Sequence, residues 1–331
     1  MLELDIEVPR RDFVLAVSFS VAASERFSLF GPSGAGKTTV LEAVAGLLRP
    51  DHGSILLAGR VLWRAGRGSR RETEAVPFWE RAVALLRQEP GLFPHLSVRE
   101  NLTYSRRRPD AIDLAGLVEL LALDGLLDAR PSALSGGQAH RVALARALAS
   151  DCEVLLLDEP YAGLDAALRR QVTALVRDEL SRRQIPSVLV SHDLAEAQAF
   201  ADRVGIIDEG RLLQIGTPHE VVVRPASRRV AELVGYQGFV DLDGAVVGVH
   251  PERVLPGAHP RLGYVLSGRV VRERPAGAGF EVDLDVGGIE LTCRLEHGTG
   301  PAGATAEVTV VDPPLFLPDG SRVSERPRLF A

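Results

Sequence analysis

The chain has 331 residues and a formal net charge of −6, and 46% of its residues are apolar and 25% charged. These proportions are normal for a folded protein with a sizeable core, so they exclude an intrinsically disordered chain, and the length allows two domains. The negative charge provides no basic footprint, and we therefore expect no nucleic acid among the partners.

The sequence pattern contains neither a membrane span nor a secretion signal. No apolar run approaches the roughly 20 residues that cross a bilayer, and segment 1–5 lacks the basic and apolar regions of a secretory signal. The two cysteines, Cys152 and Cys293, lie in segments that we expect to belong to separate domains, so a reduced, unpaired state is the simplest expectation. The sequence favours a protein of the cytoplasm.

The first 65 residues combine strand patterns with one glycine-rich loop. Apolar and polar residues alternate along residues 2–8 and 14–21, as they do in half-buried strands. A short apolar stretch at 27–30 precedes the loop, a helical pattern at 39–45 follows it, and residues 54–58 return to a strand pattern. We therefore expect a β layer beside the loop.

The loop reads GPSGAGKT over residues 31–38, which is the pattern of a phosphate-binding loop between a strand and a helix. Its glycines allow successive N–H groups to point inward and form an anion nest at the positive end of the helix. Lys37, the only lysine beside 37 arginines, adds a charge for the outer phosphates, and the Thr38 hydroxyl can ligate Mg²⁺. The residues predicted to bind nucleotide here are Gly31, Ser33, Gly34, Ala35, Gly36, Lys37, Thr38 and Thr39.

The middle of the chain predicts helices followed by an α/β region. Between residues 98 and 149 the apolar spacing is mostly helical, and Asp113 and Ser135 can serve as helix N-caps, so we expect a helical subdomain over about 89–150. Short, wholly apolar runs at 154–157, 187–190 and 204–207 are typical of strands buried in a parallel sheet.

The last part of the chain predicts a small all-β domain. From residue 235 onward, short strand patterns alternate with Gly, Pro and Asp turns, for example at 281–286 and 289–292 around a Gly-Gly turn. We place the domains at residues 1–235 and 236–331.

Four further motifs follow the phosphate-binding loop in a fixed order. They are Gln88 in LRQE, LSGGQ at 134–138, VLLLDEP at 154–160, and the pair formed by LD at 164–165 and SHD at 191–193. The ordered set resembles the ATP-binding-cassette (ABC) ATPases over about residues 1–235. The resemblance implies a P-loop NTPase, with a RecA-like core, an antiparallel β layer and a helical subdomain, and with ATP and Mg²⁺ as ligands. His140 departs from the family pattern, in which glutamine is common at this position.

Each of these motifs has a chemical reason. Asp158 ends an apolar strand, where a carboxylate can hold Mg²⁺ directly or through water. Glu159 follows it and is the predicted general base, His192 would hydrogen-bond the γ-phosphate, and the Gln88 amide can touch the metal or the water. The predicted catalytic residues are Glu159, His192 and Gln88, and the predicted metal ligands are Thr38, Gln88 and Asp158. The alternatives are a turn carboxylate pair, a structural histidine and a surface glutamine.

The LSGGQ segment opens a second helix with exposed N–H groups, which is again an anion site. By the resemblance, this segment of one subunit caps the ATP bound by the other, so we expect an isologous homodimer with two ATP molecules at its interface. The segment contributes Ser135, Gly136, Gly137 and Gln138, and the resemblance adds Asp165 and Phe13. Phe13 is our candidate for stacking on adenine, and a core position on a strand is the alternative.

The β-rich tail resembles the oligonucleotide-fold-like (OB-like) domains that follow the cassette in importer ATPases. Together with residues 92–95 and 101–104, it is most similar to molybdate importer ATPases. The resemblance implies an ATPase subunit that couples ATP hydrolysis to solute uptake, with separate transmembrane permease subunits, an indirect solute-binding protein and a peripheral location at the cytoplasmic face of the inner membrane. Ferric iron, polyamine, sulfate and thiamine are alternative solutes, and a soluble regulatory ATPase without transport is the alternative function.

Overall fold

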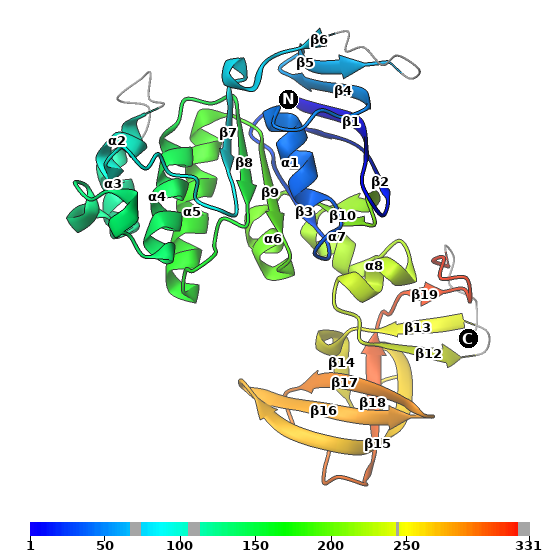
Figure 1. The fold of residues 1–331 in the computed structure, drawn as a ribbon. Helices are drawn as coiled ribbons and strands as arrows, with labels where there is room; N and C mark the ends of the chain where they lie inside the picture. Colours follow the sequence, from blue (N-terminus) through cyan, green and yellow to red (C-terminus); the bar gives the residue numbers. More distant parts are fainter. Residues whose placement is uncertain (67–73, 105–112, 243–244, 324–331) are drawn as a thin grey trace. The chain divides into compact units, whose positions relative to one another are not determined.

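The computed structural model describes residues 1–66, 74–104, 113–242 and 245–323 (Figure 1). The chain divides into two compact units, Met1–Pro218 and His219–Ala331. No helix in the described ranges is long and apolar enough to span a membrane.

The first unit is built on one mixed sheet, in the order β6-β5-β4-β1-β2-β11-β10-β3-β9-β8-β7. Its parallel part pairs β10 with β3, β3 with β9, β9 with β8 and β8 with β7. These strands are β3 (Arg26–Phe30), β7 (Val83–Leu86), β8 (Val154–Asp158), β9 (Ser187–Ser191) and β10 (Arg203–Asp208). The antiparallel part contains β1 (Leu2–Pro9), β2 (Val14–Val21), β4 (His52–Leu57), β5 (Arg60–Ala65) and β6 (Glu74–Ala75), and β11 (Arg211–Gly216) joins the two parts.

The burial patterns explain why the two parts differ. Every residue of β8 and of β9 is buried, as expected for parallel strands covered on both faces. Along β2, in contrast, exposed and buried residues alternate, which is the pattern of a sheet with one covered face. The predicted α/β fold with an antiparallel β layer is therefore confirmed.

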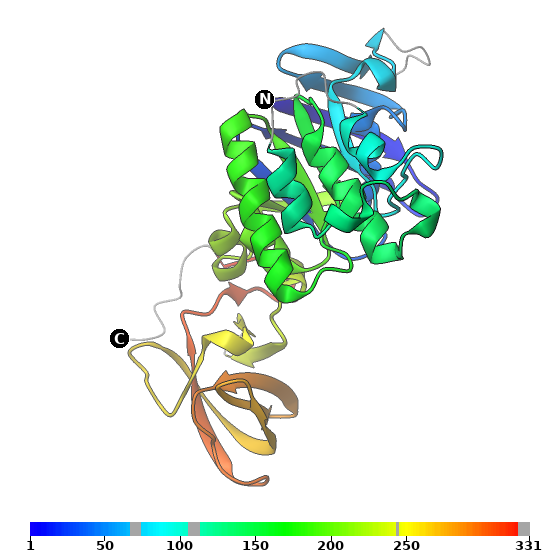
Figure 2. The ribbon, with the colours of Figure 1, turned by 90° about the vertical axis from the view of Figure 1, so that its left-hand side faces the viewer.

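Helices cover the sheet and form a group beside β7 (Figure 1 and Figure 2). That group contains α2 (Val98–Thr103), α3 (Leu114–Leu120) and α4 (Gly136–Ala149). The phosphate-binding loop leads into α1 (Lys37–Ala45), and α5 (Ala166–Arg183) and α6 (Leu194–Phe200) follow β8 and β9. Local caps set the helix starts, because Ser97 and Ser135 each form a capping box with the residue three positions later.

The second unit is rich in antiparallel strands, consistent with the predicted OB-like domain. One sheet has the order β14-β18-β15-β16-β17 and another the order β12-β13-β19. The five-stranded sheet is formed by β14 (Val254–Pro256), β15 (Gly263–Ala276), β16 (Gly279–Val286), β17 (Ile289–Leu295) and β18 (Thr305–Val311). The three-stranded sheet is formed by β12 (Gly238–Leu242), β13 (Ala245–Val249) and β19 (Leu315–Phe316), and α7 (Pro218–Val223) and α8 (Arg228–Leu233) precede it.

The division between the two units, at Pro218, lies before residue 235, where the sequence places the boundary. The prediction followed the change from helical to strand patterns, whereas contacts place the last helices in the second unit. The Tyr236 hydroxyl donates to Val222 O at 2.9 Å, and the Arg228 guanidinium lies 4.5 Å from the centre of the Phe239 ring. The Arg228 N–H also donates to Gly320 O at 2.9 Å. These long-range contacts, which the local pattern does not contain, decide the boundary.

One buried arginine connects the phosphate-loop helix to the sheet. Arg81 is only 8% exposed, and its Nη1 donates to Ala43 O at 3.0 Å and to Val44 O at 2.8 Å. Its other donors reach Val76 O at 2.9 Å and Leu62 O at 3.2 Å. The last carbonyls of a helix lack partners within the helix and carry partial negative charge, so the guanidinium satisfies the C-terminus of α1.

Replacing Arg81 by methionine should lower the free energy of unfolding by about 3 kcal/mol, because buried carbonyls of α1, β5 and the segment before β7 lose their donors. Urea denaturation followed by circular dichroism measures the change. The exposed Arg60 provides the matched control, and Arg60→Met should change the stability by less than about 0.5 kcal/mol. Equal stability of both variants would show that the buried hydrogen bonds contribute nothing.

Candidate nucleotide-binding and active site

The carboxyl ends of four parallel strands meet at one edge of the sheet. The phosphate-binding loop follows β3, Gln88 follows β7, Glu159 follows β8 and His192 follows β9. Strands β7, β8, β9 and β3 are consecutive neighbours in the sheet, so residues far apart in the chain begin from adjacent positions. In open parallel sheets this edge is where ligands bind.

The Lys37 ammonium lies within its own loop. Lys37 begins α1, and the preceding Gly36 has φ of 102°, a left-handed conformation that glycine adopts without strain. The Lys37 Nζ donates to Gly31 O and to Pro32 O, both at 2.8 Å. Burial lowers the pKa of Lys37, and the nearby Glu159 and Asp158 carboxylates oppose this shift. A charge held beneath a loop of backbone N–H groups suits a phosphate ligand.

Thr38 and Asp158 place two oxygen ligands side by side. The Thr38 Oγ1 donates to Asp158 Oδ2 at 2.9 Å. Burial raises the pKa of Asp158, while the Thr38 hydrogen bond and the Lys37 charge act in the opposite direction. A hydroxyl and a carboxylate in contact are the hard oxygen donors that Mg²⁺ prefers, so these residues fit the metal.

Glu159 has a strained backbone and a paired side chain. Its φ is 50°, in the left-handed region that non-glycine residues rarely adopt. The Glu159 N–H donates to Val190 O at 3.0 Å, which holds the residue against β9. Its Oε1 lies 2.9 Å from His192 Nδ1. The structure thus brings together the predicted base and the predicted phosphate-binding histidine.

Lys37, Thr38, Asp158 and Glu159 line one pocket of about 690 Å³, within the size range of small-molecule sites. The lining side chains come from the segment before β2, the phosphate-binding loop and the ends of β7, β8 and β9. The predicted site residues that line the pocket are Phe13, Ser33, Gly34, Gly36, Lys37, Thr38, Thr39, Gln88, Asp158 and Glu159.

Phe13 occupies a position that fits both interpretations of its ring. It is partly buried against the core of the first unit, and it lines the nucleotide-sized pocket. A Cβ added at Gly210 would come 2.4 Å from Phe13 Cδ2, so the ring packs directly on that glycine.

The pocket also contains residues that sequence reasoning missed. Arg10, Arg11 and Asp12 line it together with Pro9 and Val190. The first three form the turn between β1 and β2, in which the Arg10 N–H donates to Phe13 O at 2.8 Å. The sequence signal that could have identified them is the pair of consecutive arginines, Arg10 and Arg11, close to Phe13, although such clusters usually lie on solvated surface.

Other predicted site residues lie outside this pocket in the single chain. Ala35 lies between the lining residues Gly34 and Gly36, and Gly31 and His192 are each two residues from a lining residue. Ser135, Gly136, Gly137, Gln138 and Asp165 belong to the starts of α4 and α5. There the Gln138 Oε1 accepts from the Ser135 N–H at 2.8 Å, and Asp165 Oδ1 accepts from the N–H groups of Ala167 and Leu168, both at 2.9 Å. In one chain, therefore, the Gln138 and Asp165 side chains cap helices.

His140 connects the LSGGQ helix to the loop that carries Glu159. The His140 ring is 4% exposed, and its Nε2 lies 3.2 Å from Pro160 O. Burial lowers the pKa of His140, so the neutral ring, donating Nε2–H to this carbonyl, is the favoured form.

Comparisons with known proteins agree with this geometry. Residues 14–162 match the ABC transporter family. The chain is 39% identical over 307 residues to the Fe(3+) ions import ATP-binding protein FbpC 2 of Rhodococcus jostii, covering 89% of this chain and 86% of that protein. It is 36% identical over 354 residues to the molybdenum import ATP-binding protein ModC of Mycobacterium tuberculosis, covering 98% and 94%. A solved ATP-binding subunit of an ABC transporter has the same fold, with a TM-score of 0.57 and 24% identity over 71% of this chain and 94% of that one.

The fold, the ordered motifs and these relatives define a nucleotide-binding subunit of the P-loop class. The chain belongs to the ATP-binding subunits of ABC transporters, and the resemblance drawn from its sequence is confirmed. Subunits of this family are ATPases, and so is this chain.

Lowering the pH from 7 to 5 should destabilise the protein in part through His140. The unfolded chain protonates this histidine near pH 6.5, whereas the folded chain resists protonation. Its contribution to stability is therefore complete above about pH 6.5 and is lost as the pH falls towards the lowered folded pKa. Because glutamine does not titrate, His140→Gln should lose less stability than the unmodified protein over this range.

Urea denaturation at the two pH values measures the difference. The exposed His297 provides the control, and His297→Gln should follow the unmodified protein. Identical losses for the His140 variant and the unmodified protein would contradict the assignment.

Proposed function

We propose that the chain is the ATP-hydrolysing subunit of an ABC importer, which couples ATP binding and hydrolysis to solute uptake. The observation that carries this proposal is the convergence of Lys37, the Thr38–Asp158 pair, Glu159 and Gln88 around one pocket of about 690 Å³, with His192 2.9 Å from Glu159. Catalysis of phosphoryl transfer consists mainly of positioning and charge stabilisation, and these residues supply both.

Each residue has a distinct part in the proposed reaction. The loop N–H groups and Lys37 bind the outer phosphates of ATP, and Thr38, Asp158 and Gln88 would hold Mg²⁺, which would neutralise phosphate charge. Glu159 accepts a proton from the attacking water. His192, which lies 2.9 Å from Glu159, orients that carboxylate and donates a hydrogen bond to the γ-phosphate.

A second copy of the chain completes the proposed site. Ser135–Gln138 begin a 14-residue helix whose N-terminus attracts anions, yet these residues do not line the pocket of their own chain. A two-fold symmetric dimer can bring this helix start, together with Asp165, onto the ATP of the other copy. The proposed active form is therefore a homodimer that holds two ATP molecules.

Glu159→Gln should lower ATP turnover about 1,000-fold while retaining ATP and Mg²⁺, because only the base is removed. The variant should accumulate as an ATP-bound dimer, which size-exclusion chromatography with light scattering detects. Glu153, an exposed glutamate before β8, provides the matched control, and Glu153→Gln should keep the parental rate and remain in the parental oligomeric state. If the Glu159 variant hydrolysed ATP at the parental rate, the assignment of Glu159 as the base would be wrong. If the variant stayed strictly monomeric with Mg²⁺ and ATP, the proposed dimer would be wrong.

An exposed aromatic groove on the first unit supports docking of a permease. Phe78, Trp79 and Tyr104 are 52%, 70% and 63% exposed, and they line a cavity of about 910 Å³ together with Phe93 and residues of β7 and α4. Exposed apolar patches of this kind mark interaction sites. Since β7 leads directly to Gln88, a permease segment in this groove would contact the strand that reaches the nucleotide site. The chain would then act at the cytoplasmic face of the inner membrane, downstream of a solute-binding protein.

We propose molybdate, or a similar oxyanion, as the transported solute. The support is the molybdenum import relative, whose similarity extends over 98% of this chain and therefore includes the second unit. Ferric iron is the second candidate, because the ferric-iron import relative is 39% identical.

Trp79→Ala should reduce solute uptake at least about tenfold while leaving the ATPase rate of the isolated chain within about twofold, because the groove lies outside the nucleotide pocket. Cells that carry the variant in place of the normal gene are tested with labelled molybdate, ferric iron and sulfate. Leu47, which is 48% exposed on the same unit and does not line the groove, provides the control variant Leu47→Ala.

Uptake in cells that lack the gene identifies the solute independently of the groove. Loss of molybdate uptake supports the proposed solute, and loss of ferric-iron uptake alone would replace it by ferric iron. Normal uptake by the Trp79 variant would place the permease elsewhere.

A further inference from the structure

Helix α4, which begins with the LSGGQ segment, contacts the loop that carries Glu159. The His140 Nε2 lies 3.2 Å from the carbonyl oxygen of Pro160, the residue that follows Glu159. A Cβ added at Gly163 would lie 3.6 Å from Gly137 Cα, so the start of the helix also approaches the end of this loop. The chain between β8 and α5 is therefore in contact with α4 at two points.

The His140 ring is buried against the peptide groups of this loop. The ring is 4% exposed. Burial lowers the pKa of His140, and hydrogen bonding to the Pro160 and Glu159 carbonyls opposes this shift. The neutral ring donates Nε2–H to Pro160 O. The helix thus provides a hydrogen-bond donor directly beside the backbone of the proposed base.

Glu159 needs such support because its backbone is strained. A φ of 50° is costly for a residue with a side chain, so it persists only where the surroundings fix it. The Glu159 N–H donates to Val190 O at 3.0 Å, and the Glu159 carbonyl accepts from the Ala162 N–H at 3.3 Å. His140 adds the bond to Pro160 O. Because the backbone sets the direction of the Cα–Cβ bond, these hydrogen bonds together aim the Glu159 carboxylate.

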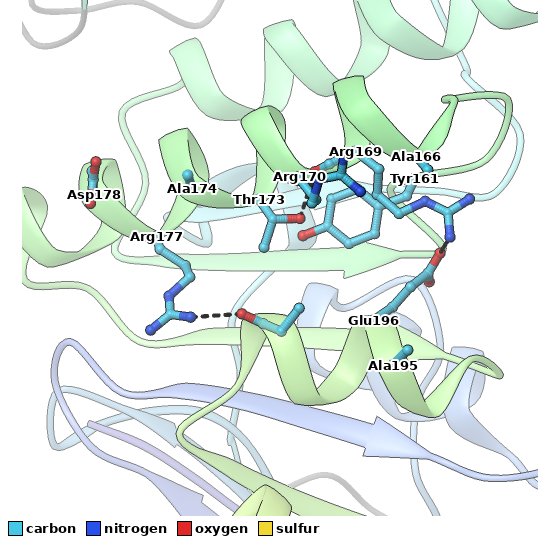
Figure 3. Close-up of a pocket in the computed structure, with 11 residues that line it drawn as sticks. Tyr161, Ala166, Arg169, Arg170, Thr173, Ala174, Arg177, Asp178, Ala195 and Glu196 are labelled. Carbon is cyan, nitrogen blue, oxygen red and sulfur yellow. Dashed lines mark hydrogen bonds and ion pairs between the residues drawn. The ribbon is translucent and has the colours of Figure 1, made fainter. Parts of the chain in front are cut away.

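Neighbouring parts of the site are held from α5 and α6 (Figure 3). Tyr161 is 2% exposed, and Figure 3 shows its ring beside α5. The Arg169 Nη1 pairs with Glu196 Oε1 at 3.0 Å. Glu196 in turn accepts from the Ser191 Oγ at 2.7 Å, directly before His192. Helices α5 and α6 thus support the neighbours of the base, and α4 supports the peptide that follows it.

We propose that His140 is a positioning residue for ATP hydrolysis. Its hydrogen bond to Pro160 O holds the Glu159 carboxylate where it accepts a proton from the attacking water. A general base must lie within hydrogen-bond reach of that water, and a displacement of about 1 Å can lower the rate about 100-fold. This role deepens the proposed function and rests on it, because Glu159 is the base of the proposed reaction.

A histidine that only filled the core would have different effects. Its replacement would lower the free energy of unfolding and leave the turnover of the folded protein unchanged. Replacing a positioning histidine lowers kcat while nucleotide binding remains, because the phosphate-binding residues Lys37 and Thr38 are untouched.

Two variants of His140 test the role of its donor. His140→Leu removes the N–H donor and keeps an apolar side chain, whereas His140→Gln keeps an N–H donor. We expect kcat to fall about 30-fold in His140→Leu and to stay within about threefold of the parent in His140→Gln, while the Kd for nucleotide stays within about twofold in both. Phosphate release from ATP and equilibrium binding of a slowly hydrolysed fluorescent ATP analogue measure these quantities on the full chain with Mg²⁺.

Leu148 provides the matched control within the same helix. It is 1% exposed and lies about two turns, or about 12 Å, further along α4. Leu148→Ala should lower the melting temperature but leave kcat within about threefold of the parent, and circular dichroism shows that each variant is folded at the assay temperature. An unchanged kcat in His140→Leu, or equal decreases in His140→Leu and in either His140→Gln or Leu148→Ala, would overturn the proposal.

A double variant shows whether His140 acts through Glu159. Because Glu159→Gln already lacks the base, adding His140→Leu should lower the remaining turnover by less than about twofold. A further decrease of about 30-fold would mean that His140 acts elsewhere, and the positioning role would be wrong. A parent without ATPase activity would contradict the proposed function and this role with it, whereas an active parent with an unaffected His140→Leu variant contradicts the positioning role alone.

Discussion

The parallel pairing of β7, β8, β9 and β3 is the constraint on which the rest of the structure depends. Parallel strands end at the same edge of a sheet, so the loop of Lys37, the Asp158–Glu159 pair and His192 begin from neighbouring positions although the chain separates them widely. The two central strands, β8 and β9, can pair in this way because their interior residues are apolar and every residue of both strands is buried. A polar residue inside β8 or β9 would disturb the sheet and, with it, every loop of the site.

The site concentrates charge and strain that the ligand-free protein must tolerate. Burial disfavours the charged forms of both Lys37 and Asp158, as the directions of their pKa shifts show. Glu159 adds a left-handed backbone conformation, held by its hydrogen bond to Val190 O. Strained and desolvated groups of this kind persist at functional sites because the surrounding sheet determines their positions. Bound phosphates and metal would neutralise the charges of Lys37 and Asp158, so nucleotide binding is physically coupled to the stability of the first unit.

Specific contacts join the nucleotide loops to the helices around them. His140 connects α4 to Pro160, directly after Glu159, and the Arg169–Glu196 pair connects α5 to α6, directly after the His192 loop. Arg81 fastens the far end of α1 to β5 and to the segment before β7. The loops of the site are therefore next to helices that are held in place by contacts between residues distant in the chain. A change at the LSGGQ helix or at the Arg169–Glu196 pair thus has a direct structural route to Glu159 and His192.

The sequence by itself determined the features that depend on neighbours within a few residues. The glycines of residues 31–38, the capping boxes at Ser97 and Ser135 and the apolar runs of the buried strands specify their conformations locally, so the α/β fold and the family could be predicted. The tertiary structure alone decided which carbonyls surround Arg81, that residues 10–12 line the nucleotide pocket, and that the two units divide at Pro218. These features join residues that are distant in the chain, and their hydrogen bonds and burial exist only after the sheet and helices have packed, so no local pattern of residue types records them.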